Sequence, residues 1–170
     1  MENPLLKYKN DTNDSFIRFD LIKDEHFEPA FEVALATAKE NLQKIIDSPE
    51  TPTFENTIEA IEYVDEDLER IKFIFLNLKD ANTSEELERV AKVILPKMAD
   101  FVNDLSLNEK LFEKVKYVFN SKPVLSSKEQ SRLLELTYKE FIRTGALLEE
   151  SDKQKLRQYD RDIILLAQKF

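Results

Sequence analysis

A row of carboxylates on one side of a predicted helix is the pattern in this sequence closest to a catalytic or metal-binding site. Its members recur at spacings of three and four residues or lie beside such positions: Glu55, Glu59, Glu62, Asp65, Glu66, Asp67 and Glu69. Helical bundles that hold two metal ions combine such carboxylates with a Glu-x-x-His motif on each of two helices. The chain has one histidine, so we interpret the row as a solvated acidic face, partly compensated by Lys and Arg at neighbouring turns.

The single histidine, His26, stands at the predicted start of a helix. A catalytic zinc site usually needs two or three His with a carboxylate, and the zincin helix carries two His one turn apart with a Glu between them. This sequence cannot build that site. We expect His26 to cap the helix or to form hydrogen bonds at the surface.

Other kinds of catalytic chemistry also lack their residues. The absence of Cys excludes thiolate nucleophiles, zinc-thiolate sites and disulfides, and one Gly is too few for a phosphate-binding loop. Tyr138 and Arg143 could face a substrate from one helix, but packing of the ring and matching of the Arg charge to the helix C-terminus are the simpler interpretation. We predict no catalytic, cofactor-binding or metal-binding residue in these 170 residues.

Composition indicates one all-α domain. Leu, Ala, Glu, Lys and Ile dominate, while Gly and Pro number one and six among 170 residues. The formal charge of −9 disfavours a nucleic-acid partner, since phosphate binding needs a surplus of Lys and Arg. The sequence has no apolar run long enough to span a membrane and no secretory signal at its start. We therefore expect a cytoplasmic protein with neither a nucleic-acid nor a membrane partner.

The elements expected to position these residues form an antiparallel bundle of about six helices over residues 23–170. Residues 1–22 form an irregular segment, with a loop at 10–15 and apolar anchors at Phe16, Ile17 and Phe19. The first two helices span about 24–47 and 53–78. Their predicted hairpin packs along a seam at spacings of three and four: Ile61, Val64, Leu68, Ile71, Phe75 and Leu78.

The later helices carry clearer start and stop signals. Capping residues precede helices near 84–105 and 127–144, Asn108 precedes a shorter helix, and Gly145 is placed for a left-handed C-cap. Pro96 predicts a kink within one helix rather than two helices. The last helix, from about 149, has an apolar stripe consisting of Leu156, Tyr159, Ile163, Leu166 and Phe170. It has no stop signal, and we expect the natural chain to continue.

Six short motifs, spread over nearly the whole chain in a consistent order, carry a family resemblance. They occupy residues 3–6, 19–31, 52–60, 75–83, 95–97 and 133–146, and include NPLL, PTFENTIEA and LLELTYKEFIRTGA. On these motifs the chain resembles the N-terminal region of the thimet oligopeptidase, oligopeptidase A and peptidyl-dipeptidase family of zinc metallopeptidases.

The resemblance implies a much longer parent protein, a mostly helical ellipsoid with a deep channel and one zinc at the channel floor. In the family, a His-Glu-x-x-His helix and a downstream Glu hold the metal, and short peptides are cleaved in the channel. No position of this sequence matches that motif. The resemblance implies that these helices form part of the channel wall and lid, with the remainder of the parent chain as their partner.

Two hypotheses follow. The first is an N-terminal helical domain of a zinc-dependent oligopeptidase or peptidyl-dipeptidase, inert alone. The second is a free-standing helical module that binds a protein partner and has no catalytic role. Both predict an uncovered apolar patch where the partner docks.

Overall fold

The computed structural model describes residues 3–7 and 17–167. In this part of the chain there is no strand, and the predicted all-α class with about six helices is confirmed. The helices of 13 residues or more are α1 (Phe27–Asp47), α3 (Glu66–Ala81), α4 (Glu85–Ser106), α5 (Glu109–Ser121), α6 (Lys128–Thr144) and α7 (Glu150–Ala167). The predicted loop at 10–15 and the anchor Phe16 lie outside the described residues.

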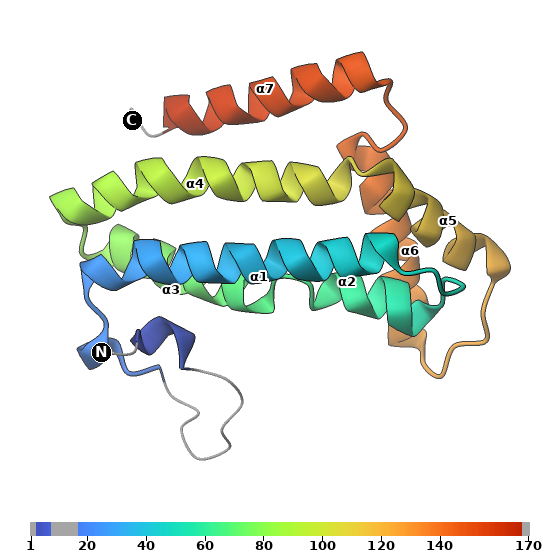
Figure 1. Ribbon diagram of the computed structural model, residues 1–170, viewed down its shortest axis with the longest axis horizontal. Helices are drawn as coiled ribbons and strands as arrows, with labels where there is room; N and C mark the ends of the chain where they lie inside the picture. Colours follow the sequence, from blue (N-terminus) through green and yellow to red (C-terminus); the bar gives the residue numbers. More distant parts are fainter. Residues whose placement is uncertain (1–2, 8–16, 168–170) are drawn as a thin grey trace.

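Four of these helices lie side by side, with their long axes in similar directions (Figure 1). Helix α1 lies between α3 and α4, and α7 packs on the side of α4 that faces away from α1. Helices α5 and α6 pack against each other and cross one end of the layers. The outermost layer, α7, therefore has one packed side and one open side.

The centre of the core lies between α1 and its two neighbours. Phe27 of α1 and Phe75 of α3 are both fully buried, and their rings meet edge to face with centroids 5.2 Å apart. Phe31 and Phe101 are also fully buried. Aromatic side chains bury the largest apolar areas, so these rings contribute much of the hydrophobic stabilisation.

The N-terminal residues are anchored by Leu5 rather than by the predicted Phe19. Leu5 is fully buried, whereas Phe19 is half exposed, so the prediction for Phe19 is wrong. Ile17 packs against the core at partial burial, as predicted. Polar contacts hold the turn that carries Leu5: Asn3 donates to the carbonyl of His26 (2.8 Å), and Arg70 donates to the carbonyl of Leu5 (3.1 Å).

The predicted continuous helix over residues 53–78 is wrong, although its seam is right. The chain forms a widened helical segment (Phe54–Glu59), a short α2 (Ala60–Glu62), a turn at 63–65, and then α3. The first segment contacts α5 and α6, whereas α3 contacts α1. A change of direction lets one chain bury Phe54 and Ile58 on one side and Leu68 on the other. No Gly or Pro marks this turn.

The predicted helix ends at Asn108 and Gly145 are confirmed, and α4 and α6 each begin one residue later than predicted. Ser84, Asn108 and Ser127 accept hydrogen bonds from backbone amides in the first turns of α4, α5 and α6. Gly145 has φ 108°, and a Cβ there would meet Leu148 at 2.8 Å, so only glycine fits without strain. Helix α4 continues through Pro96, as expected of one helix rather than two.

Candidate functional site

The acidic row of residues 55–69 does not converge on one site. Asp67 pairs with Arg70 at 2.6 Å, and Glu69 pairs with Lys72, so the neighbouring cations neutralise part of the row as predicted. Asp65 is half buried, and burial, reinforced by the charge of Glu69, raises the pKa of its carboxyl. Among the described residues no cluster of three His, Cys, Asp or Glu could hold a metal ion.

His26 has a structural role at the start of α1. Its Nδ1 accepts a hydrogen bond from the backbone N–H of Lys23 (3.1 Å), and its own backbone N–H donates to the carbonyl of Lys23 (2.9 Å). The predicted surface hydrogen bonding is therefore confirmed. His26 also binds Asn3 through its carbonyl, which links the N-terminal turn to α1.

Tyr138 and Arg143 do not face a common site. The Tyr138 ring stacks on Phe119 with centroids 4.0 Å apart and on Phe112 at 5.9 Å, between α5 and α6. Arg143 is exposed and pairs with Glu140 at 2.6 Å in the last turn of α6. Packing and charge matching account for both residues, in agreement with the simpler interpretation.

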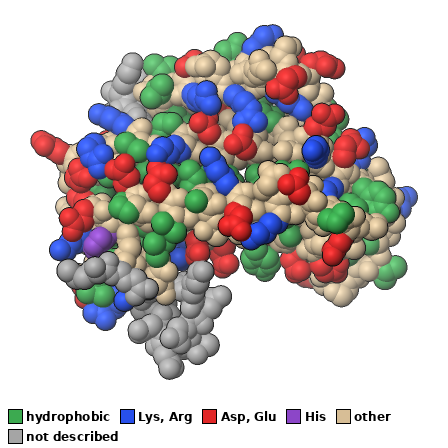
Figure 2. Space-filling model, in the orientation of Figure 1, with side chains coloured by type: hydrophobic (Ala, Val, Ile, Leu, Met, Phe, Trp, Pro, Cys, Tyr) green, Lys and Arg blue, Asp and Glu red, His purple; other side chains and the backbone are tan. Residues whose placement is uncertain are grey.

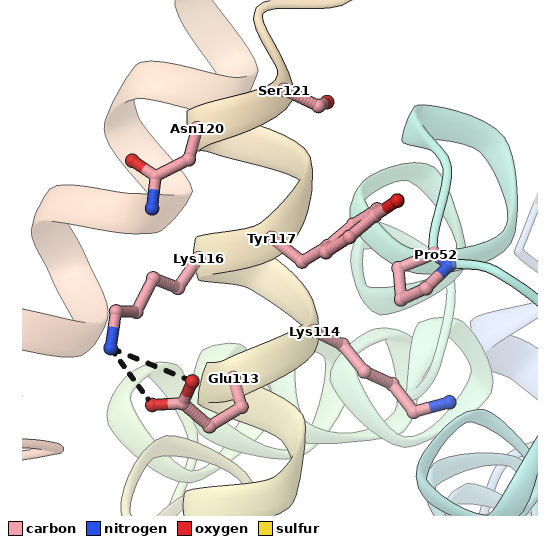
Figure 3. Close-up of a pocket in the computed structure, with 7 residues that line it drawn as sticks. All are labelled: Pro52, Glu113, Lys114, Lys116, Tyr117, Asn120 and Ser121. Carbon is pink, nitrogen blue, oxygen red and sulfur yellow. Dashed lines mark hydrogen bonds and ion pairs between the residues drawn. The ribbon is translucent and has the colours of Figure 1, made fainter.

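A cleft with a volume of about 650 Å³ lies beside α5 (Figure 3). Lys116 and Glu113 point toward each other and pair at 3.1 Å, while Lys114 donates to the carbonyl of Ser48 (2.7 Å). The Ser121 hydroxyl donates to the carbonyl of Val118 (2.8 Å). These polar groups are used within the fold, and no nucleophile is paired with a base here.

A second cleft, of about 450 Å³, lies where α1, the corner between α4 and α5, and the start of α7 meet. Leu42, Ile46 and Leu107 contribute buried apolar surface to it. Its charged residues carry both signs: Lys39, Asp104, Glu109, Glu150, Lys153 and Arg157. The sequence contains no sign of this cleft, because a Lys on an amphipathic helix is usually exposed to solvent and nothing in the local pattern marks Lys153 as buried.

Helix α7 leaves most of its predicted apolar stripe uncovered. Tyr159, Ile163 and Leu166 are each more than half exposed, whereas Leu156 is partly buried and Phe170 lies outside the described residues. The helix is tied to α4 by charged residues instead: Arg157 binds Asp104 (2.8 Å) and Arg161 binds Asp100 (2.7 Å). Helix α7 therefore presents an uncovered apolar stripe, the kind of surface that both hypotheses predict.

The surface is otherwise mixed in character. Figure 2 shows acidic, basic and hydrophobic side chains interspersed over one face of the molecule. No helix among the described residues has the length and apolar character needed to cross a membrane.

The protein is all-α, and its described residues do not bring together a set of side chains arranged for catalysis. No family model matches the chain. Curated proteins do match it. It is 32% identical over 154 residues to a dipeptidyl carboxypeptidase from Salmonella typhimurium, and the match spans 90% of this chain but 23% of that protein. The dipeptidyl carboxypeptidase of Escherichia coli is 32% identical over 153 residues, spanning 89% of this chain and 22% of its own length.

A plant relative extends the match over nearly the entire chain. The probable cytosolic oligopeptidase A of Arabidopsis thaliana is 23% identical over 169 residues, which are 99% of this chain and 23% of that protein. The chain is thus related in sequence to the family recognised from its motifs, that of the oligopeptidases and dipeptidyl carboxypeptidases. It spans less than a quarter of the length of these relatives, which is consistent with an N-terminal region.

Proposed function

We propose that this chain is the N-terminal helical domain of a zinc-dependent oligopeptidase or peptidyl-dipeptidase, with residues 23–170 as its helical unit. In this proposal the domain forms part of the wall and lid of a channel that admits short peptides. It is inert by itself, because its residues do not fit a zinc ion: the sequence has one His, and the described residues provide no ligand cluster. The single zinc would be held by the remainder of the parent chain.

The observation that carries the proposal is the uncovered stripe of α7. A helix of a finished domain usually turns its apolar side toward the core. Here the charged residues Arg157 and Arg161 hold α7 on α4, and Tyr159, Ile163 and Leu166 face outward. The Salmonella relative is more than four times as long as the segment that matches this chain. If this protein is equally long, a later part of the same polypeptide would cover the stripe.

The proposal extends to location and partners. A relative named as a probable cytosolic oligopeptidase A supports a cytoplasmic location for the parent. The chain's partner is then the rest of the parent polypeptide, and short peptides are the substrates of the whole protein. The surplus of negative charge gives no support to a nucleic-acid partner.

A peptidase assay tests this function. The purified 170-residue chain, supplied with zinc, is incubated with a quenched fluorogenic peptide beside a mock purification, and the native protein carrying this sequence is isolated and assayed in parallel. We expect no cleavage by the chain, and cleavage by the native protein that a zinc chelator abolishes. A chain that cleaves above the mock level, or a native protein without peptidase activity, would overturn the proposal.

A further inference from the structure

Lys153 is a buried cation without a partner among the described residues. Its side chain belongs to α7, and the residue is 6% exposed. No described residue forms a hydrogen bond or an ion pair with its Nζ, whereas Lys155, two positions further along α7, pairs with Asp152 at 2.7 Å. Among the described residues, every side-chain nitrogen that is fully shielded from solvent has a hydrogen-bond partner. An unpartnered nitrogen must therefore touch solvent. The Nζ of Lys153 therefore reaches the cleft that the residue lines.

An ammonium in this position favours an anion. Its four-carbon stem packs along apolar surface, but the charge loses most of its contact with water. Removing a charge from water is costly unless an opposite charge or several hydrogen-bond acceptors replace the lost hydration. A ligand oxygen that enters the cleft would supply those acceptors, and a charge-assisted hydrogen bond is stronger than a neutral one.

The surroundings of Lys153 narrow the kind of anion. Leu42, Ile46 and Leu107 line the same cleft, and each exposes a small apolar edge to it. The volume of about 450 Å³ lies within the range of small-molecule sites. A ligand with a carboxylate on an aliphatic body matches both features.

The exposed charges around the cleft further limit the kind of anion that could bind. Asp104 is already paired with Arg157, and Lys39 is exposed to water. Glu109 and Glu150 are exposed carboxylates at the same cleft. They would repel a second negative charge on a ligand, so phosphate and other multivalent anions are disfavoured relative to a single carboxylate.

We propose that this cleft binds the carboxylate of an aliphatic residue, such as the C-terminal residue of a short peptide, through the Nζ of Lys153. The proposal concerns binding alone and does not rest on the peptidase assignment. The same carboxylate chemistry could be supplied by a free peptide terminus or by an acidic side chain from the rest of a longer parent protein.

Titration of the isotope-labelled 170-residue chain by NMR tests the proposal, with N-acetyl-leucine as the probe and N-acetyl-leucinamide as its uncharged match. We expect saturable shifts of amide signals at residues 107–109 and 150–157 with the acid and none with the amide. Equal shifts with both compounds, or none with either, would overturn the proposal. Inorganic phosphate should fail to displace the acid, and effective displacement would contradict the part assigned to Glu109 and Glu150.

Three variants separate the charge of Lys153 from a structural effect. Lys153→Met should weaken N-acetyl-leucine binding by about tenfold or more, because one charge-assisted hydrogen bond is lost. Lys153→Arg should restore most of it, and Lys155→Met should bind like the wild type. Wild-type affinity in Lys153→Met would refute the site.

A fourth variant tests the site if Lys153→Met fails to fold. Glu150→Gln, at an exposed position, should tighten binding by about twofold or more. Unchanged or weaker binding would count against the site.

The source of the carboxylate is distinguished by repeating the titration on the native protein. If the ligand is a free peptide terminus, N-acetyl-leucine binds both the 170-residue chain and the native protein. If an acidic side chain of the parent occupies the cleft, the probe binds the chain and not the native protein. Both results require Lys153 to bind a carboxylate, and failure to bind either form would contradict the proposal whatever the peptidase assay shows.

Discussion

Arg161 of α7 donates a 2.7 Å hydrogen bond from its Nε to Oδ1 of Asp100 on α4. One turn earlier, Arg157 forms the equivalent 2.8 Å contact with Asp104. The Asp100 carboxylate raises the pKa of the Arg161 guanidinium, which therefore stays charged. Because such partly exposed pairs contribute little each, α7 is held to the bundle less firmly than α1 or α3, whose apolar faces are buried.

Removing both contacts should loosen α7 without unfolding the domain. For the double variant Arg157→Gln/Arg161→Gln, we expect faster amide hydrogen exchange in α7 and only a small loss of overall stability. Lys155→Gln, on the same helix but paired with its neighbour Asp152, is the control and should leave exchange unchanged. Exchange in the double variant that matches the wild type would show that other contacts hold α7.

The exposed stripe of α7 predicts a small effect of mutation in the 170-residue chain and a larger one in the proposed parent protein. Ile163→Glu/Leu166→Glu should change the unfolding free energy of the 170-residue chain by about 0.5 kcal/mol or less per site, since both side chains face solvent. It should also reduce the binding of a hydrophobic dye. In the proposed longer parent protein the same change should lower the melting temperature, because a later part of the chain would cover the stripe there.

Val124 supplies the matched control for that experiment. It is fully exposed in the loop between α5 and α6, so Val124→Glu should leave the melting temperature of both proteins unchanged. If the α7 variant melts like the wild type in the parent, the stripe is not the docking surface.

The aromatic contact at the centre of the core predicts a large loss of stability. Phe75→Ala should lower the unfolding free energy by about 3–5 kcal/mol, because it removes a fully buried ring from its edge-to-face contact with Phe27. Phe73, two residues earlier on α3, is 56% exposed, and Phe73→Ala should cost less than about 1 kcal/mol. Urea unfolding of the two variants gives the comparison, and similar losses would contradict the packing described.

Asp65 and Glu135 should titrate with opposite effects on stability. Burial raises the folded pKa of Asp65 above its ordinary value of 3.8, so the ionised carboxylate opposes folding at neutral pH and the penalty disappears as the pH falls below that value. Asp65→Asn should therefore be more stable than the wild type at pH 7 and equal to it near pH 3.

Glu135 provides the control of opposite sign. Hydrogen bonds from Lys139 and Arg132 lower its folded pKa, so its ionised form stabilises the fold above the unfolded value of 4.5, and this contribution is lost as the pH falls through the folded pKa. Glu135→Gln should lose stability at pH 7 and match the wild type at low pH. Urea midpoints at several pH values measure both effects. A Glu135→Gln variant more stable than the wild type at pH 7 would show that the ionised carboxylate opposes folding.

The features of the fold that depend on neighbouring residues could be predicted from the sequence. Capping by Asn108 and Ser127, the left-handed cap at Gly145 and the all-α class follow from residue types and spacing, and the structure has each of them. The break at 63–65 was not predictable, because it arises from the different directions in which Phe54 and Phe75 are buried rather than from a Gly or Pro. Tertiary packing there overrides local propensity.

The same distinction between local and long-range causes applies to the candidate functional residues. Residue types were enough to anticipate that His26 forms surface hydrogen bonds and that Tyr138 packs, and contacts within the fold account for both. The environment of Lys153 depends on three segments far apart in the chain, so its burial leaves no local signal. The outward turn of Tyr159 and Ile163 is likewise invisible in sequence, because an apolar stripe has the same spacing whether it is covered or not.

The central claim is that these helices work as the N-terminal part of a longer peptidase, and the mass of the native protein tests it most directly. Immunoblotting of cells that express the natural gene, with an antibody raised against the 170-residue chain, gives that mass. We predict a species roughly four times larger than the 20.0 kDa chain, in proportion to the 23% of the Salmonella relative that the match spans. A native product of 20.0 kDa would contradict the claim.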